Sequence, residues 1–181
     1  MIFAVDQAGA LSHVSQEWTR LTGQPVSVAL NEGWLSCVHE HDREVVRMVL
    51  IQAIDERSEF SVQFRLSSAD GGIRWIGAGG VPSFGPPGRT FLGYLGSMTE
   101  LTPDAPNVLT AVGRMGRFVP PPPHPATVTS DHLETIADHL LIANALIEGD
   151  GAKSALPGLR AALYEVGRAL AKKIDAERVL N

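Results

Sequence analysis

Residues 60–81 constrain the fold more than any other part of the chain. In the segment FSVQFRL, apolar residues alternate with polar ones: Phe60, Val62, Phe64 and Leu66. A strict period of two predicts a strand with one buried face. Asp70-Gly71 follows in the turn SSADGG, and this pair is a strong short-range signal for a β-hairpin. IRWIGAGGV is then the return strand, so the sequence predicts an antiparallel pair.

Strands are also predicted at both ends of the first hundred residues. IFAV (2–5) and ALSHVS (10–15) flank a turn and predict an opening hairpin, while FLGYLGSM (91–98) predicts a last strand. Residues 42–56 have apolar side chains at the spacing of an amphipathic helix: Val45, Val46, Val49, Leu50, Ala53 and Ile54. The sequence therefore predicts an α+β fold, in which two early strands, short helices and three late strands follow one another.

Charge and composition exclude several classes of protein. The chain of 181 residues has 15 Lys+Arg against 20 Asp+Glu, so it offers no basic field to a phosphate backbone. Its only cysteine is Cys37, which excludes an intrachain disulfide. No apolar run reaches the ~18 residues of a membrane span, and the start MIFAVDQAGAL lacks the pattern of a signal peptide. We therefore expect a cytoplasmic protein that binds neither nucleic acid nor membrane.

Prolines divide the chain at residues 101–127. Pro103, Pro106 and the run VPPPPHP (119–125) lie there, and proline runs adopt the extended polyproline II form at ~3.1 Å per residue. The pattern predicts a semi-rigid linker between a first domain, residues 1–100, and a helical region, residues 128–181. The prolines also break any continuous helix that leaves the first domain.

The segment WLSCVHEHDREVV (34–46) concentrates side chains that bind metals or act as catalysts. His39 and His41 are two residues apart, and no second cluster supplies paired ligands at the spacing of a zinc site. A nucleophilic Cys37 acting with His39 would need a depressed thiol pKa. The simpler interpretation is that Asp42 caps the following helix by accepting from its first free N–H groups, while His39 or His41 supplies local hydrogen bonds. The segment therefore predicts the start of a helix rather than a metal or catalytic site.

Four short motifs together resemble the PAS domain: WTRLTGQ (18–24), GWLSCVHEHDRE (33–44), FSVQFRLSSADGGIRWI (60–76) and GYLGSMTE (93–100). They occur in the family's order, and the elements VH-x-x-DR and DG-x-x-RW resemble its subgroup in bacterial sensor proteins. The resemblance covers residues 2–100. It implies a five-stranded antiparallel sheet with short helices on one face, a cavity between the sheet and helix 42–56, and a role in sensing ligands or making protein contacts. Ser97-Met98-Thr99 replaces the family's usual Asp-Ile-Thr, which puts the usual signal exit in doubt.

The residues argue against the cofactors known from domains that this one resembles. Flavin-adduct members use a cysteine in an Asn-Cys-Arg type motif, whereas Cys37 stands in LSCVH. Haem-binding members place an axial histidine within the long helix, but His41 lies at its end. A small apolar ligand remains compatible with the sequence, as does a fully packed core without a ligand. The candidate pocket residues are Trp18, Leu21, Trp34, Val46, Val49, Phe64 and Trp75.

The chain beyond residue 128 predicts two amphipathic helices. Ser130 or Asp131 caps the first helix, and Gly149 ends it. Apolar residues spaced three and four apart form one stripe on each helix, and they are the candidate dimer or partner interface: Leu133, Ile136, Leu140, Ile147, Leu159, Leu163, Val166 and Leu170. Two such helices bury their stripes as an antiparallel hairpin, and two hairpins would make a four-helix dimer.

The expected function is non-enzymatic signal transduction by a PAS sensor or interaction domain with a helical dimerisation or docking tail. The expected partners are a second copy of the chain and signalling proteins such as a histidine kinase or a response regulator. The alternative is a phosphotransfer protein that uses His132 or His139 as phosphoryl acceptor. The sequence leaves open the ligand, the partner, and whether the helices dimerise or pack on the sheet of their own chain.

Overall fold

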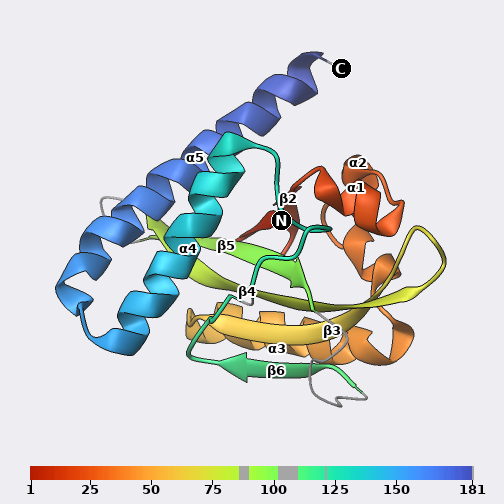
Figure 1. Cartoon of the computed structure of the whole chain (residues 1–181). Helices are drawn as coiled ribbons and strands as arrows, with labels where there is room; N and C mark the ends of the chain where they lie inside the picture. The colour runs from red at the N-terminus through yellow and green to blue at the C-terminus, as the bar shows by residue number, and fades with distance from the viewer. Residues whose placement is uncertain (86–89, 102–109, 121, 181) are drawn as a thin grey trace.

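A single antiparallel sheet organises the protein. The computed structural model describes residues 1–85, 90–101, 110–120 and 122–180 (Figure 1). The sheet has the order β2-β1-β5-β4-β3-β6. Its strands are β1 (Ile2–Asp6), β2 (Leu11–Val14), β3 (Phe60–Ser67), β4 (Ile73–Gly85), β5 (Thr90–Glu100) and β6 (Val112–Met115). The α+β fold and the five predicted strands are confirmed, and β6 is an additional strand.

The antiparallel pair predicted around Asp70-Gly71 is the β3–β4 hairpin. Phe64 pairs with Ile76 and Arg65 pairs with Trp75. At the turn, an Asp70 carboxylate oxygen accepts a hydrogen bond of 2.9 Å from the backbone N–H of Gly72. Phe60, Val62, Phe64 and Leu66 all point to the same face of the sheet, which is the face that the short helices cover. We call this the inner face.

The elements that cover the inner face lie between β2 and β3 in the sequence. They are α1 (Glu17–Thr22), α2 (Val26–Ala29), η1 (Gly33–Cys37), η2 (Glu40–Asp42) and α3 (Arg43–Glu56). Val46 and Ala53 of α3 are fully buried, while Val45, Val49, Leu50 and Ile54 pack against the same core at its margin. The amphipathic helix predicted at residues 42–56 is confirmed.

The interpretation of residues 101–127 as a spacer is wrong for the part that the structure describes. Val112–Met115 form β6, which pairs with β3 from Gln63↔Val112 to Phe60↔Met115. Phe118 is 1% exposed and lies on the outer face of the sheet, against the backbone of Gly79. The pairing of β6 with β3 and the buried ring of Phe118 hold this segment on the domain. The predictions for Pro103, Pro106 and Pro121 fall outside the described residues.

A helical hairpin covers the outer face. It consists of α4 (His132–Asp150), η3 (Lys153–Ala155) and α5 (Leu156–Leu180), and its two long helices run antiparallel beside the sheet (Figure 1). Asp131 caps α4 by accepting from the backbone N–H groups of Leu133 and Glu134, as predicted. The helix ends at Gly151 rather than at the predicted Gly149. The hairpin therefore packs on the sheet of its own chain.

A second core joins the hairpin to the outer face. Its buried members are Ile2, Val81, Leu95, Phe118, Ala137, Leu141, Leu163 and Leu170. Since Ile2, Val81 and Leu95 come from three strands of the sheet, the hairpin closes an apolar surface that would otherwise face water. The six strands thus lie between two cores, one on each face.

The apolar residues predicted to form the interface of the two helices are only partly the ones that the structure buries. Leu163 and Leu170 are buried in the second core, and Leu133, Leu140 and Val166 pack at its margin, but Ile136 is 49% exposed. Ile147 and Leu159 are half-buried. The residues of α4 that face the sheet are Ala137, Leu141, Asn144 and Ala145. Because α4 is apolar around most of its circumference, spacing alone did not identify the face that the sheet covers.

Candidate functional site

The inner core contains a small apolar cavity under the helix α3. Val46 and Leu50 form its roof, Phe60, Val62 and Phe64 of β3 form its floor, and its volume is about 50 Å³. The remaining lining residues are Phe3, Val5, Leu11, Trp18, Trp34, Ala78 and Met98. Every one of these side chains is apolar or aromatic. The cavity therefore favours an uncharged apolar occupant, since an ion there would lack partners.

Four of the seven predicted pocket residues line this cavity: Trp18, Trp34, Val46 and Phe64. Leu21 and Val49 belong to the same core but do not reach the cavity. Trp75 is wrong as a pocket residue, because it pairs with Arg65 and so lies on the opposite side of the pleat from Phe64. The Arg65 guanidinium lies over the Trp75 ring at 5.5 Å.

Sequence reasoning missed most of the strand residues that line the cavity. Phe60 and Val62 share the alternation of Phe64, so that pattern was available as a signal. Phe3, Leu11 and Met98 come from strands whose contact with the cavity depends on the sheet order. No local pattern in the sequence reveals that order.

The cavity does not match the needs of a flavin or a haem. Its volume of about 50 Å³ is too small for the fused rings of a flavin or a haem, and its lining is apolar or aromatic throughout. Neither Cys37 nor a histidine is among the lining residues. Burial raises the pKa of the Cys37 thiol, which is opposite to the depression that a nucleophilic cysteine requires.

The histidine-rich corner at residues 34–46 starts α3, but by different contacts from those predicted. Asp42 occupies the N-cap position, yet its side chain makes no capping hydrogen bond. Its carboxylate is fully buried and instead binds Arg65, whose Nε and backbone N–H each donate at 2.9 Å. His39 Nδ1 accepts from the backbone N–H of His41 at 3.4 Å, so His39 supplies the local hydrogen bond that was predicted for one of the two histidines. Within residues 1–85, 90–101, 110–120 and 122–180, no group of three side chains is placed to hold a metal ion.

Asp42 also holds the segment that returns toward β6. Its Oδ1 accepts a hydrogen bond of 3.4 Å from the backbone N–H of Ala111. Burial alone would raise the pKa of the Asp42 carboxyl, but the hydrogen bonds and charge of Arg65, together with the Ala111 N–H, hold the pKa below its ordinary value. The carboxylate therefore stays ionised and links three segments: the start of α3, β3 and the approach to β6.

A second buried carboxylate links β6 to the hairpin. Glu59 Oε1 accepts from Asn144 Nδ2 at 2.8 Å, and Glu59 Oε2 accepts from the backbone N–H of Phe118 at 3.1 Å. Asn144 is fully buried on α4, whereas Glu59 directly precedes β3. This polar contact crosses an otherwise apolar interface and so fixes where along α4 the helix meets the sheet.

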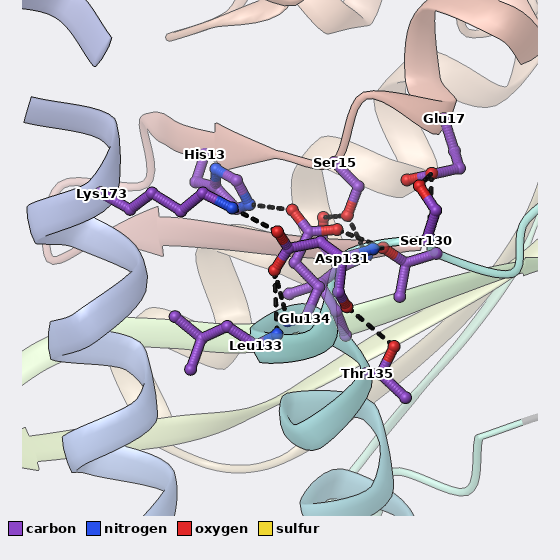
Figure 2. Close-up of polar contacts among 11 residues, drawn as sticks. His13, Ser15, Glu17, Ser130, Asp131, Leu133, Glu134, Thr135 and Lys173 are labelled. Atoms are coloured by element: carbon purple, nitrogen blue, oxygen red, sulfur yellow. Dashed lines mark hydrogen bonds and ion pairs between the residues drawn. The ribbon is translucent and has the colours of Figure 1, made fainter. Parts of the chain in front are cut away.

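Polar side chains also join the first turn of α4 to β2 and α1 (Figure 2). His13 Nε2 lies 3.0 Å from Glu134 Oε1, and Lys173 of α5 pairs with Asp131. Burial alone would raise the pKa of the Glu134 carboxyl, but hydrogen bonds from His13, Ser15 and Thr129 hold the pKa below its ordinary value. These contacts fasten the open end of the hairpin to the N-terminal strands.

Comparison with known proteins identifies the family. The model of the PAS fold matches residues 11–92. This part of the chain is a PAS domain. PAS domains are in general sensory modules of signal transduction. Among the helices of the described residues, none is both long and apolar enough to span a bilayer.

Three solved structures are similar to this chain. The RsLOV d2 variant is 17% identical with a TM-score of 0.50, and the match covers 96% of this chain and 88% of that chain. The Rhodobacter sphaeroides LOV protein is also 17% identical, over 95% of this chain and 90% of that chain, with a TM-score of 0.49. The PAS domain of a Colwellia psychrerythraea protein is 23% identical, over 56% of this chain and 85% of that chain, with a TM-score of 0.46.

A relative from Sinorhizobium fredii, the uncharacterized protein y4lL, is 38% identical over 102 residues. The match covers 56% of this chain but 12% of that protein. The chain therefore corresponds to a small part of this larger relative.

Proposed function

We propose that this protein is a non-enzymatic signal-transduction module. Its PAS cavity receives a small apolar ligand, and its helical hairpin passes the change to a second copy of the chain or to a signalling partner such as a histidine kinase or response regulator. The observation that carries this proposal is the position of β6. At one end, β6 lies beside α3, the helix that roofs the cavity. At the other end it leads to Phe118, which binds Glu59 next to the hairpin.

The roof end of this connection depends on close packing. Ala111 is held by Asp42 at the start of α3, and two residues later Gly113 lies so close to Val49 that an added Cβ would meet Val49 Cγ2 at 2.1 Å. A shift of α3 away from the sheet would therefore displace β6, because Asp42 and Val49 both belong to the segment that moves.

The hairpin end depends on Phe118. Its backbone N–H binds Glu59, which also binds Asn144 of α4, and its ring lies in the second core beside Leu141. Displacement of β6 would pull this ring and loosen the contact with α4. The connection runs over the sheet edge from the inner to the outer face, and it needs no continuous output helix.

A pair of α3 variants tests the proposal. Leu50→Ala enlarges the cavity from its roof, whereas Ile51→Ala changes an exposed neighbour on the same helix. We expect Leu50→Ala to speed amide hydrogen exchange in β6 and α4 beyond what its change in global stability explains, and Ile51→Ala to leave it unchanged. Equal exchange in β6 and α4 for the two variants would refute a mechanical link from the roof.

The surface of α4 supports the docking part of the proposal. Ile136 is 49% exposed and Leu146 is 59% exposed on this helix. Native mass spectrometry of the full chain reports the oligomeric state and any retained small molecule together. We expect the wild-type chain to be a dimer and Ile136→Asp to be a monomer. A monomeric wild-type chain would contradict docking to a second copy and would leave a different signalling protein as the partner.

The phosphotransfer alternative is favoured by one contact. His139 is exposed, and its Nδ1 lies 2.7 Å from the carbonyl oxygen of Thr135. A carbonyl accepts, so the proton sits on Nδ1 and the lone pair of Nε2 is the nucleophile. Incubation with a phosphorylated response regulator tests this role: an acid-labile phosphohistidine that His139→Ala abolishes and His132→Ala retains would support it and would contradict the non-enzymatic function.

A further inference from the structure

A groove on the outer side of the protein has the properties of a second binding site, separate from the PAS cavity. It lies between the hairpin and the segment from β2 to α2, and its volume is about 560 Å³. That volume falls within the roughly 300–1,000 Å³ of small-molecule sites. We call this space the hairpin groove. Figure 2 shows the polar side chains that border it.

The carboxylates of the hairpin groove outnumber its cations. Glu17, Asp131 and Glu134 line it together with Lys173 and His13. Lys173 pairs with Asp131, and His13 pairs with Glu134. Glu17 is the third carboxylate; it pairs with Arg20, which lies outside the lining, and the buried N-terminal ammonium of Met1 also interacts with it electrostatically.

Glu17 is incompletely satisfied although it is buried. The residue is 2% exposed, and its Oε1 accepts long hydrogen bonds from the backbone N–H and hydroxyl of Ser130, at 3.3 and 3.4 Å. The Arg20 guanidinium reaches the same oxygen at 3.3 Å from an exposed position. Glu17 Oε2 is buried and has no hydrogen-bond partner among the residues that the structure describes. A buried, unpaired carboxylate oxygen is costly, and a water, an ion or a ligand that donates to it would offset this cost.

The rest of the lining defines what that partner looks like. Val14, Val26, Leu30 and Leu170 give the hairpin groove apolar walls near the carboxylate. We propose that the hairpin groove binds an organic ammonium ion with a short apolar chain, whose N–H groups donate to Glu17 Oε2 and whose chain lies along these walls. Because one wall belongs to α1, α2 and β2 and the other to α4 and α5, the bound cation would hold the hairpin to the PAS domain. This site is independent of the apolar cavity and of the function proposed above.

Hexylammonium is a suitable probe, with hexan-1-ol as its uncharged counterpart. We expect NMR titration of the full chain to shift the methyl signals of Val26 and Leu170, with affinity for the ammonium about tenfold or more above that for the alcohol. Glu17→Gln should remove this preference. Glu165→Gln, which changes an exposed carboxylate paired with Arg168, should retain it.

Two tryptophan variants keep the test decisive if Glu17→Gln fails to fold. Ser27 is an exposed residue that lines the hairpin groove, and Val28 is its exposed neighbour outside the lining. Ser27→Trp should abolish binding by filling the groove, whereas Val28→Trp should leave it intact. Three results would overturn the proposal: no binding at millimolar hexylammonium, equal affinity for hexan-1-ol, or shifts at Leu50 and Val62 of the inner cavity instead of at the groove.

Discussion

Asn144 of α4 donates a hydrogen bond of 2.8 Å to Glu59, the residue before β3, and this contact ties the hairpin to the sheet inside an apolar interface. The Glu59 carboxylate also accepts a hydrogen bond from the backbone N–H of Phe118. One carboxylate therefore joins the start of β3, the segment after β6 and the helix α4. The hairpin is therefore positioned by a specific polar contact as well as by burial of apolar surface.

Replacing Asn144 tests how much this contact contributes. Asn144→Ala removes a hydrogen bond to a buried carboxylate, and we expect it to lower the free energy of unfolding by about 1.5–3 kcal/mol. Leu146→Ala, on the exposed side of the same helix, should change it little. Urea denaturation measures both values, and equal stability of the two variants would show that the hydrogen bond does not anchor α4.

The ring of Phe118 attaches the hairpin to the sheet by burial of apolar surface in the second core. Phe118→Ala should lower the free energy of unfolding by about 3–5 kcal/mol, because the surrounding second core fills the lost volume only in part. Val119→Ala changes the exposed next residue and serves as the control. We expect hydrogen exchange to be faster in α4 and α5 of Phe118→Ala than in β1. Uniform exchange across the chain would instead mean that the hairpin and sheet unfold as one unit.

Two Asp–Arg pairs with different burial allow a matched test of electrostatics. Asp42 is buried with Arg65, whereas Asp70 and Arg74 form an exposed pair. Asp42→Asn should lower the free energy of unfolding by about 3 kcal/mol at pH 7, because Arg65 loses its buried partner. Asp70→Asn should have little effect, since exposed pairs contribute little.

The same pair predicts a dependence on pH. The pKa of the folded Asp42 carboxyl lies below its ordinary value of 3.8, so its ion pair contributes stability above that pH and loses it as pH falls through the folded pKa. Glu134, whose pKa is lowered from 4.5, acts in the same direction. Wild-type stability should therefore fall below about pH 4, and the fall should be shallower in Asp42→Asn. Parallel pH profiles for the two proteins would contradict this assignment.

The approach of β6 to α3 predicts a rescue. Gly113→Ala places a methyl group 2.1 Å from Val49 Cγ2 and should destabilise the protein by roughly 1–3 kcal/mol. Val49→Ala removes the clashing methyl groups, so the double variant should be more stable than the sum of the single effects predicts. Thermal denaturation of the four proteins checks this, and strict additivity would show that the two residues do not press on each other.

Local patterns predicted the elements of the PAS domain well, because each carries its own signal. The alternation in β3, the Asp70-Gly71 turn and the apolar spacing of α3 need no knowledge of the rest of the chain. The cap of α4 at Asp131 is of the same kind. Where a residue's environment depends on its neighbours in sequence, the prediction was sound.

Contacts between distant segments were not accessible in that way. Asp42 has the sequence position of a cap, but Arg65 competes for its carboxylate from 23 residues away. Trp75 looks like a core aromatic until the pairing of β3 with β4 places it opposite Arg65. The sequence did not predict β6, because the strand has only four residues and lies in a segment rich in proline. Phe118 is a single buried apolar residue there, so it forms no recognisable pattern.

Gly79 carries the Phe118 ring because it has no side chain: a Cβ there would meet the ring at 2.3 Å. The width of one methyl group at this position therefore decides whether the aromatic ring is seated on the strand. An alanine at residue 79 would clash with this ring and also with the backbone carbonyl oxygen of Phe60 in β3, at 2.3 Å. The absence of a side chain at residue 79 therefore permits two close approaches at once, that of the neighbouring strand and that of the ring on which the hairpin rests.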